Sequence, residues 1–214
     1  MNYDKTCQIL IIGDPYVGKT SIISRYTNGT FKEEYLSTVG LDYYPKQEII
    51  DNKTINIKLW DTAGEERYKS LTQNLFRNAE GVLLVFDVTK IDTFNNLKEW
   101  ISSIKLNMEG KNIFIPVVII GNKLDMEDQR EITKEQAEKF VSENNYKYFE
   151  TSAKTGEGVD KSIRELATQI LKQEGQMDDQ KAARATSRQL KKEDIVNNNN
   201  NNDENKRRGC CIII

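Results

Sequence analysis

Residues 13–20 read Gly13-Asp14-Pro15-Tyr16-Val17-Gly18-Lys19-Thr20 and match the pattern G-x-x-x-x-G-K-[ST] in full. The apolar run Cys7–Ile12 comes directly before them and predicts a buried strand, and the amphipathic stretch that follows, with Ile22, Ile23 and Tyr26, predicts a helix. The backbone N–H groups of such a loop, together with the positive end of the helix dipole, can surround an anion. The alternative is a glycine-punctuated turn with an exposed lysine, which explains neither the full match nor its position.

The anion that this loop predicts is the phosphate chain of a nucleoside triphosphate. In loops of this kind the lysine, here Lys19, reaches the β- and γ-phosphates, and the hydroxyl after it, here that of Thr20, binds Mg²⁺. The residues that we expect at the phosphates are Gly13, Asp14, Pro15, Tyr16, Val17, Gly18, Lys19, Thr20 and Ser21. The pattern alone does not identify the base.

Short apolar runs alternate with amphipathic stretches over about 170 residues, which is typical of an α/β fold. The expected strands are Cys7–Ile12, Leu41–Ile50, Thr54–Trp60, Val82–Asp87, Ile115–Gly121 and Tyr146–Thr151. The turn Asp51-Asn52-Lys53 joins the second and third strands as a hairpin. Helical stripes run through Phe94, Leu97, Ile101 and Ile104, and through Val159, Ile163, Leu166, Ile170 and Leu171. Asp92 and Thr133 are expected N-caps, the latter in a capping box with Gln136. We therefore predict a six-stranded, mostly parallel sheet with one antiparallel edge strand and helices on both faces.

The composition excludes several kinds of chemistry. The chain has 214 residues and no histidine, which rules out Ser-His-Asp and Cys-His nucleophile pairs and a histidine general base. Its formal net charge of −2 gives no indication of nucleic-acid binding. Three cysteines cannot form a disulfide framework, and neither a signal peptide nor an apolar run of about 20 residues is present. We expect a protein on the cytosolic side of membranes.

Two later motifs indicate guanine as the base. Asn122-Lys123-Leu124-Asp125 follows a predicted strand, and the Asp125 carboxylate can accept two hydrogen bonds from guanine N1–H and N2–H₂, a donor pair that adenine lacks. Ligands bind at the carboxyl ends of the strands in sheets of this kind. Thr151-Ser152-Ala153-Lys154 follows the next strand and can place a backbone N–H at the guanine O6. The expected nucleotide-binding residues of these two motifs are Asn122, Lys123, Asp125, Ser152, Ala153 and Lys154.

A third motif, Trp60-Asp61-Thr62-Ala63-Gly64, ends another predicted strand. Asp61 can hold the magnesium shell, and the Gly64 backbone N–H can reach the γ-phosphate. Thr38 can complete the magnesium site from a polar loop, although taken alone it could equally be an ordinary surface threonine. The predicted metal ligands are thus Thr20, Thr38 and Asp61.

In this order and at these spacings the motifs resemble those of the Ras superfamily of small GTPases, over Lys5 to about Lys172. Within the superfamily the chain is similar to Rab proteins, as judged from Ile57–Asp61, Arg67–Thr72 and Phe86–Thr89. The resemblance implies an effector loop of Tyr35, Leu36, Ser37, Thr38, Val39, Gly40, Leu41, Asp42 and Tyr43. It also implies that Phe31 packs against the guanine, and that Tyr43, Trp60 and a residue near Phe76 form an aromatic effector surface. A pair of core aromatics across the hairpin is the alternative for Tyr43 and Trp60.

The family pattern implies Lys19, Gly64 and the residue after Gly64 as the catalytic positions. Most Rab proteins have glutamine after the glycine, whereas this chain has Glu65. A glutamine orients the attacking water and donates to the transition state, but a carboxylate cannot donate. The intrinsic hydrolysis rate is therefore open. Pro15 stands where Ras itself has glycine, and Rab proteins vary there. Two rivals to a GTPase switch are a nucleotide-gated membrane scaffold with very low hydrolysis and a P-loop ATPase or nucleotide kinase.

The chain is expected to divide into a GTP-binding domain at residues 1–174, a disordered tether at 175–209 and a lipidation motif at 210–214. The tether contains the run Asn197–Asn202, which cannot bury enough surface to offset its ordering entropy. Cys210 and Cys211 precede three isoleucines in a C-a-a-X pattern, for which geranylgeranyl is the expected lipid, with removal of residues 212–214 left open. The resemblance implies a monomer anchored to cytosolic membrane faces. Its partners would be Rab-type effectors, an exchange factor, a GTPase-activating protein and a dissociation inhibitor.

Overall fold

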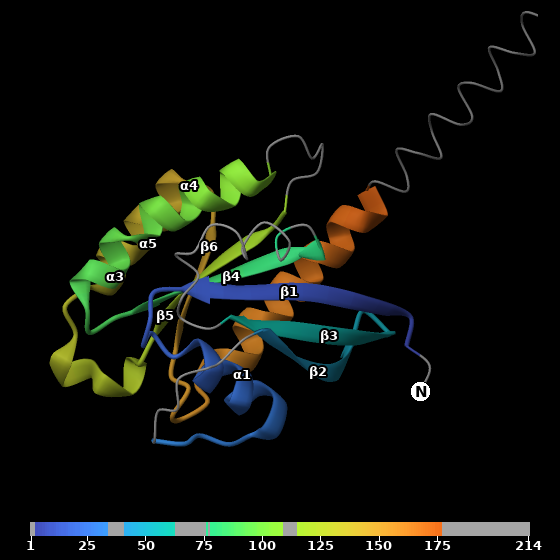
Figure 1. Cartoon of the computed structure of the whole chain (residues 1–214), viewed down its shortest axis with the longest axis horizontal. Helices are drawn as coiled ribbons and strands as arrows, with labels where there is room; N and C mark the ends of the chain where they lie inside the picture. Colours follow the sequence, from blue (N-terminus) through green and yellow to red (C-terminus); the bar gives the residue numbers. More distant parts are fainter. Residues whose placement is uncertain (1–2, 34–40, 63–75, 77, 109–114, 177–214) are drawn as a thin grey trace, which may run out of the picture. The chain divides into compact units, whose positions relative to one another are not determined.

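The computed structural model describes residues 3–33, 41–62, 76, 78–108 and 115–176. Within these residues six strands form one sheet in the order β2-β3-β1-β4-β5-β6 (Figure 1). Their bounds are β1 (Lys5–Gly13), β2 (Leu41–Ile50), β3 (Lys53–Thr62), β4 (Gly81–Asp87), β5 (Val117–Asn122) and β6 (Lys147–Thr151). Only β2 runs antiparallel to its neighbour among these strands. The predicted sheet, mostly parallel with one antiparallel edge strand, is confirmed.

Helices cover both faces of the sheet, because the central strands are apolar on both sides. One face buries Leu10, Ile12, Leu84 and Ile119 in a cluster with side chains of α4 (Leu97–Met108) and α5 (Lys134–Glu143). Alternate residues such as Ile9 and Ile11 point to the other face, which carries α1 (Lys19–Asn28). In Figure 1, α4 and α1 lie on opposite sides of the strands. The second face also carries residues 159–170 of the helix that begins at residue 159, whose Leu166 and Ile170 lie against Gly81.

The predicted helical stripe from Phe94 to Ile104 is divided in the structure. A short helix, α3 (Ile91–Asn95), ends at Asn96, and α4 begins at the next residue. Asp92 was expected as an N-cap, but Lys90 has that position and Asp92 lies in the first turn, where its negative charge still favours the helix dipole. The capping box before α5 is confirmed: Thr133 Oγ1 accepts from the Gln136 N–H at 3.2 Å, and Gln136 Oε1 accepts from the Thr133 N–H at 2.9 Å.

The hairpin turn is shorter than expected. Ile50 pairs with Lys53, so the loop consists of Asp51 and Asn52 rather than of three residues. Both loop residues have positive φ, 50° and 62°, as a two-residue turn matching the twist of the strands requires. Residues 115 and 116, expected in the fifth strand, precede β5 instead. None of the helices in the described ranges is long and apolar enough to cross a bilayer.

Candidate nucleotide-binding site

The loop between β1 and α1 can be built only with glycine at its two ends. Gly13 has φ +143°, and a Cβ on it would lie 2.1 Å from the Val85 carbonyl oxygen of β4. Gly18 caps α1 with φ +94°, and a Cβ on it would lie 2.4 Å from Asn122 Nδ2. The two glycines of the motif therefore reflect close approach of the loop to β4 and to the end of β5.

Lys19 is buried at the start of α1. Its Nζ donates to the carbonyl oxygens of Gly13 and Asp14, at 2.8 Å and 3.0 Å. The first turn of α1 contains no acidic residue, so the positive end of the helix dipole is not offset there. A buried ammonium and a helix N-terminus at one loop suit a polyphosphate. The other loop residues lie as follows: Val17 is fully buried, Pro15, Thr20 and Ser21 are half-buried, and Tyr16 is exposed with φ 66°.

Asn122 holds three segments of the site together. Its Nδ2 donates to the Val17 carbonyl oxygen at 2.8 Å. Its Oδ1 accepts from Thr151 Oγ1 at 3.0 Å and from the Ala153 N–H at 3.2 Å. The phosphate loop, the end of β5 and the loop after β6 are thereby fixed to one another. The sequence assigns Asn122 to nucleotide binding, and in the structure its side-chain amide bonds to the loops that form the site.

Asp125 lies in η1 (Leu124–Gln129), directly after β5, and its residue is exposed. Its Oδ1 accepts from Ser152 Oγ at 2.5 Å. Ser152 Oγ in turn accepts from the Thr155 N–H at 3.1 Å, so its own hydrogen is directed at the carboxylate. The loop after β6 thus orients the carboxylate that the sequence assigns to base recognition.

Lys123 is held by residues that sequence reasoning did not assign to the site. It has φ +73°, and its Nζ lies 2.6 Å from Asp87 Oδ2 at the end of β4. Asp87 is buried, and its Oδ1 accepts from the Thr89 N–H at 2.9 Å and from Thr89 Oγ1 at 2.7 Å. The signal for this anchor is an aspartate followed two residues later by threonine, which is common in local turns.

Arg25 of α1 fixes the loop after β6 from the other side. Its Nε donates to the Ala153 carbonyl oxygen at 2.8 Å, and its guanidinium also donates to the carbonyl oxygens of Lys154 and Gly29. Lys154 Nζ lies 3.3 Å from Glu33 Oε1, and both side chains are exposed. Phe31, expected at the base, is half-buried in the segment after α1. Arg25 is a second site-forming residue that no motif indicated.

The predicted magnesium ligands are only partly within the described residues. Asp61 is fully buried near the end of β3, and Thr20 is the second residue of α1. A carboxylate and a hydroxyl are ligands that Mg²⁺ accepts, so the residues present fit the ion. Thr38, Gly64 and Glu65 lie outside the described residues, as do Tyr35–Gly40 of the expected effector loop.

Tyr43 and Trp60 face each other across the β2–β3 pair, with ring centroids 5.2 Å apart. Tyr43 is 45% exposed, whereas Trp60 is partly buried and packs against the core cluster, so only Tyr43 lies clearly outside the core. Trp60 Nε1 donates to Gln8 Oε1 at 2.7 Å, which fixes the indole. Phe76 is fully buried and is not itself on a surface, and its sequence neighbours lie outside the described residues.

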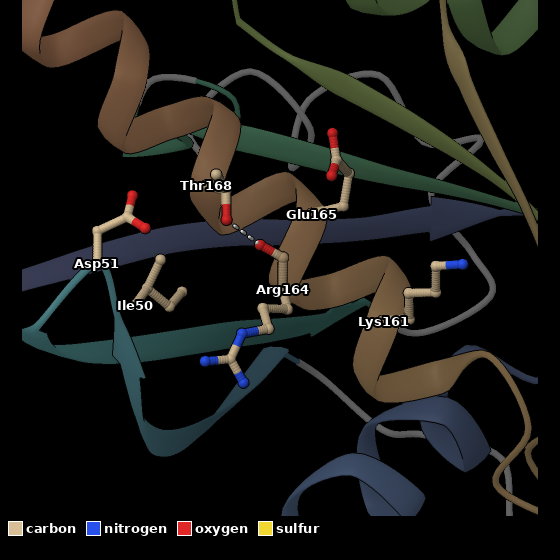
Figure 2. Close-up of a pocket in the computed structure, with 6 residues that line it drawn as sticks. All are labelled: Ile50, Asp51, Lys161, Arg164, Glu165 and Thr168. Carbon is tan, nitrogen blue, oxygen red and sulfur yellow. Dashed lines mark hydrogen bonds between the residues drawn. The ribbon is translucent and has the colours of Figure 1, made fainter.

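A separate hollow of about 240 Å³ lies between the hairpin turn and the helix that begins at residue 159 (Figure 2). Arg164 extends toward the hairpin and donates to the Ile49 carbonyl oxygen, whereas Lys161 Nζ lies over the Phe149 ring. None of the predicted site residues lines it. The lining residues are Ile50, Asp51, Lys161, Arg164, Glu165 and Thr168.

The sheet, the glycine-bounded loop and the loops after β5 and β6 define the class of P-loop nucleotide-binding proteins. The model of the Ras family matches residues 8–172. Ras-related protein Rab-13 of Mesocricetus auratus is 40% identical over 173 residues, which cover 81% of this chain and 84% of that protein. Rab-27B of Rattus norvegicus is 39% identical over 181 residues, covering 80% and 82%. Rab-8B of Pongo abelii is 37% identical over 184 residues, covering 86% and 87%. The chain belongs to the Ras family, as a small GTPase of the Rab type that binds guanine nucleotide and Mg²⁺.

Proposed function

We propose that this GTPase is a switch that recruits effector proteins to membranes in vesicle trafficking while GTP is bound and releases them after hydrolysis to GDP. The observation that supports it best is the joining of three loops by Asn122, which brings the phosphate loop next to the base motif. Family membership supports the same conclusion, because the similar proteins are Rab proteins.

Bound Mg²⁺ would neutralise charge on the phosphates, and its proposed ligands are Thr20, Asp61 and, with GTP only, Thr38. Lys19 and the N–H groups at the start of α1 bind the phosphates and hold them for in-line attack by water. The negative charge that develops on the phosphate oxygens faces the Lys19 ammonium and the helix dipole. Glu65 stands at the sequence position that orients the water in the family.

The direct test is a competition of GTP against ATP for the purified chain, followed by single-turnover hydrolysis of bound GTP. The chain is first loaded with a fluorescent guanine nucleotide, and we expect GTP to displace this nucleotide whereas ATP does not. Hydrolysis is measured with and without a Rab-type GTPase-activating protein. ATP binding as tight as GTP binding would refute the proposal, and absence of hydrolysis in both conditions would favour a GTP-gated scaffold.

Thr38→Ala is expected to separate the two nucleotide states. In the proposed switch, the segments that carry Thr38 and Gly64 are held by contacts that only the γ-phosphate offers. The variant should keep GDP affinity within about twofold while losing capture of effectors in the GTP state, because the contact proposed for the Thr38 hydroxyl requires the γ-phosphate. Binding of both nucleotides is measured by fluorescence titration, with Thr168→Ala as the control, because the Thr168 hydroxyl donates to the Arg164 carbonyl oxygen within its own helix and belongs to no predicted site. Equal losses of GDP and GTP affinity would contradict the switch model.

Glu65→Gln is expected to change the single-turnover rate severalfold. The substitution adds an amide that can donate to the transition state, but it removes the carboxylate that could accept a proton from the water. Whether the hydrolysis rate rises or falls therefore reports which of the two effects dominates. Rapid quench of preloaded GTP measures the rate. Glu66→Gln is the matched control because it removes the same charge one residue away. A rate identical to that of the parent chain would place the Glu65 side chain away from the water.

The proposal for membrane attachment is that Cys210 and Cys211 carry geranylgeranyl groups and that the segment expected at residues 175–209 tethers them to the domain at residues 1–174. Gly175 and Gln176 are helical in the structure, so the proposed flexible part begins after them. From Gln176 to Cys210 there are 35 residues, which span roughly 33 Å as a flexible chain. One prenyl chain binds a bilayer only marginally, and two chains beside Lys206-Arg207-Arg208 bind stably.

The double change Cys210→Ser and Cys211→Ser is expected to move the protein into the cytosol without altering its GTP affinity, because both cysteines lie outside the residues that form the site. Cys211→Ser alone should lose most membrane residence, and Cys210→Ser alone should retain partial, faster-exchanging binding. Fractionation and photobleaching recovery of tagged protein measure the effect, and Cys7→Ser is the control. Retention of the double variant on membranes would refute lipid anchoring through this pair.

A further inference from the structure

Asp14, the second residue of the phosphate loop, is buried and held by side chains from the junction of α3 and α4. Its Oδ2 accepts from Asn96 Nδ2 at 2.6 Å, and its Oδ1 accepts from Trp100 Nε1 at 2.9 Å. Asp14 is 6% exposed and Trp100 is 9% exposed. These bonds join the loop to a part of the chain more than eighty residues away.

The junction itself is firmly built. The Asn96 N–H donates to the Asp92 carbonyl oxygen and so ends α3, while the Asn96 carbonyl oxygen accepts from the N–H groups of Glu99 and Trp100 and so begins α4. The Trp100 ring packs in the core cluster beside Leu97. Both donors to Asp14 therefore belong to hydrogen-bonded, packed structure outside the loop.

The backbone of Asp14 takes part in the anion site directly. Its carbonyl oxygen accepts from Lys19 Nζ at 3.0 Å, so its position also determines where the buried ammonium is held. Pro15 follows, which restricts Asp14 to extended backbone and supplies no N–H of its own. A change in how the Asp14 side chain is held must therefore be transmitted to the phosphate-binding backbone.

A carboxylate is an unexpected side chain beside a polyphosphate, because two negative charges repel each other. Its burial costs free energy unless hydrogen bonds compensate. Asn96 and Trp100 supply such bonds from neutral groups. The arrangement thus places a buried carboxyl side chain in an anion-binding loop and compensates its burial with two hydrogen bonds.

We propose that Asp14 is a positioning residue that anchors the phosphate loop to the α3–α4 junction and thereby sets the rate at which bound guanine nucleotide dissociates. The inference rests on the proposed function, since it concerns the same site. A loop held in its bound geometry loses little entropy on binding, and effects of this kind are seen mainly in the dissociation rate.

The first experiment measures dissociation of a fluorescent GDP analogue in excess GDP, well below the unfolding temperature. Trp100→Phe and Asn96→Ala keep the carboxylate and remove one donor each, so we expect each to accelerate dissociation by roughly tenfold. Tyr26→Phe is the matched control for the first, because it removes a hydrogen bond from a buried aromatic ring to the Glu48 carboxylate. Asn107→Ala is the control for the second, since its Nδ2 donates to Ser103 within α4.

The second experiment observes the bond itself. The chain has two tryptophans, so ¹⁵N-labelled protein gives two indole N–H signals, and Trp60 serves as the internal reference. Asp14→Ala is expected to shift the Trp100 indole signal and to speed its hydrogen exchange, leaving the Trp60 signal in place. Combining Asp14→Ala with Trp100→Phe should give the same dissociation rate as Asp14→Ala alone.

Dissociation at the parent rate in both donor variants would overturn the proposal. Equal acceleration by Tyr26→Phe and Asn107→Ala would overturn it too, since general loss of stability would then account for the effect. An unchanged Trp100 indole signal in Asp14→Ala would show that the bond does not form in solution. Failure of the parent chain to bind GDP would instead refute the proposed function.

Discussion

Asn122→Ala is expected to lower GDP affinity by a hundredfold or more, the largest loss that we foresee from one substitution in the described site. The change removes the bonds to the Val17 carbonyl oxygen, to Thr151 Oγ1 and to the Ala153 N–H. Asn122 is 1% exposed, so the abandoned partners are shielded from water. Each buried partner left unsatisfied costs about 1–3 kcal/mol, and about 1.4 kcal/mol corresponds to a tenfold change in affinity.

The loss is measured by titration with a fluorescent GDP analogue and by chemical unfolding of the same preparation. Asn144→Ala is the matched control, because Asn144 Nδ2 donates to the Phe140 carbonyl oxygen at the end of α5, on the surface. Asn122→Asp sharpens the test: it keeps an acceptor for Thr151 and Ala153 but sets an oxygen against the Val17 carbonyl. Unaltered GDP affinity in Asn122→Ala would show that the three loops hold their places without this residue.

Features encoded by neighbouring residues were predictable from the sequence. The spacing of apolar residues along the chain predicted the strands and helices and hence the sheet. The capping box at Thr133 and Gln136 was predicted correctly because both partners lie within one turn of helix. The position of the hairpin was predicted correctly. Its loop has two residues rather than three, because Lys53 forms a cross-strand pair with Ile50, and a turn-forming composition does not reveal that pair. The N-cap at Asp92 was wrong because a residue type that favours the N-cap does not fix where a short helix begins.

The bonds that assemble the site could not be predicted in the same way. Asn122 contacts Val17 across 105 positions of the chain, and Trp100 contacts Asp14 across 86. Arg25 reaches Ala153 across 128. Such contacts depend on how the ends of several strands and helices meet, which no local pattern records. The motifs therefore predict residues that face a ligand, but they do not indicate the residues that hold the loops in place.

Asp125→Asn is expected to shift base preference from guanine to xanthine nucleotides. The carboxylate offers only acceptors, which suit the N1–H and N2–H₂ donors of guanine. The amide puts a donor against the guanine amino group, whereas xanthine carries a carbonyl oxygen there. Ser152 Oγ holds one carboxylate oxygen at 2.5 Å, and an amide oxygen can keep that bond, so the substituted side chain should retain its orientation. A mismatched pair of this kind costs about 1–3 kcal/mol for each unpaired group.

Competition between GDP and xanthosine diphosphate for one fluorescent nucleotide measures the preference. We expect the ratio of the two affinities to change by roughly a hundredfold, following about 1.4 kcal/mol for each factor of ten. Asp128→Asn is the matched control, because Asp128 is exposed on the same short helix and its substitution removes the same charge. Ser152→Ala should weaken GDP binding without favouring xanthine, since it loosens the carboxylate but keeps its chemistry. If Asp125→Asn retains GDP affinity and gains none for xanthosine diphosphate, the carboxylate does not contact the base.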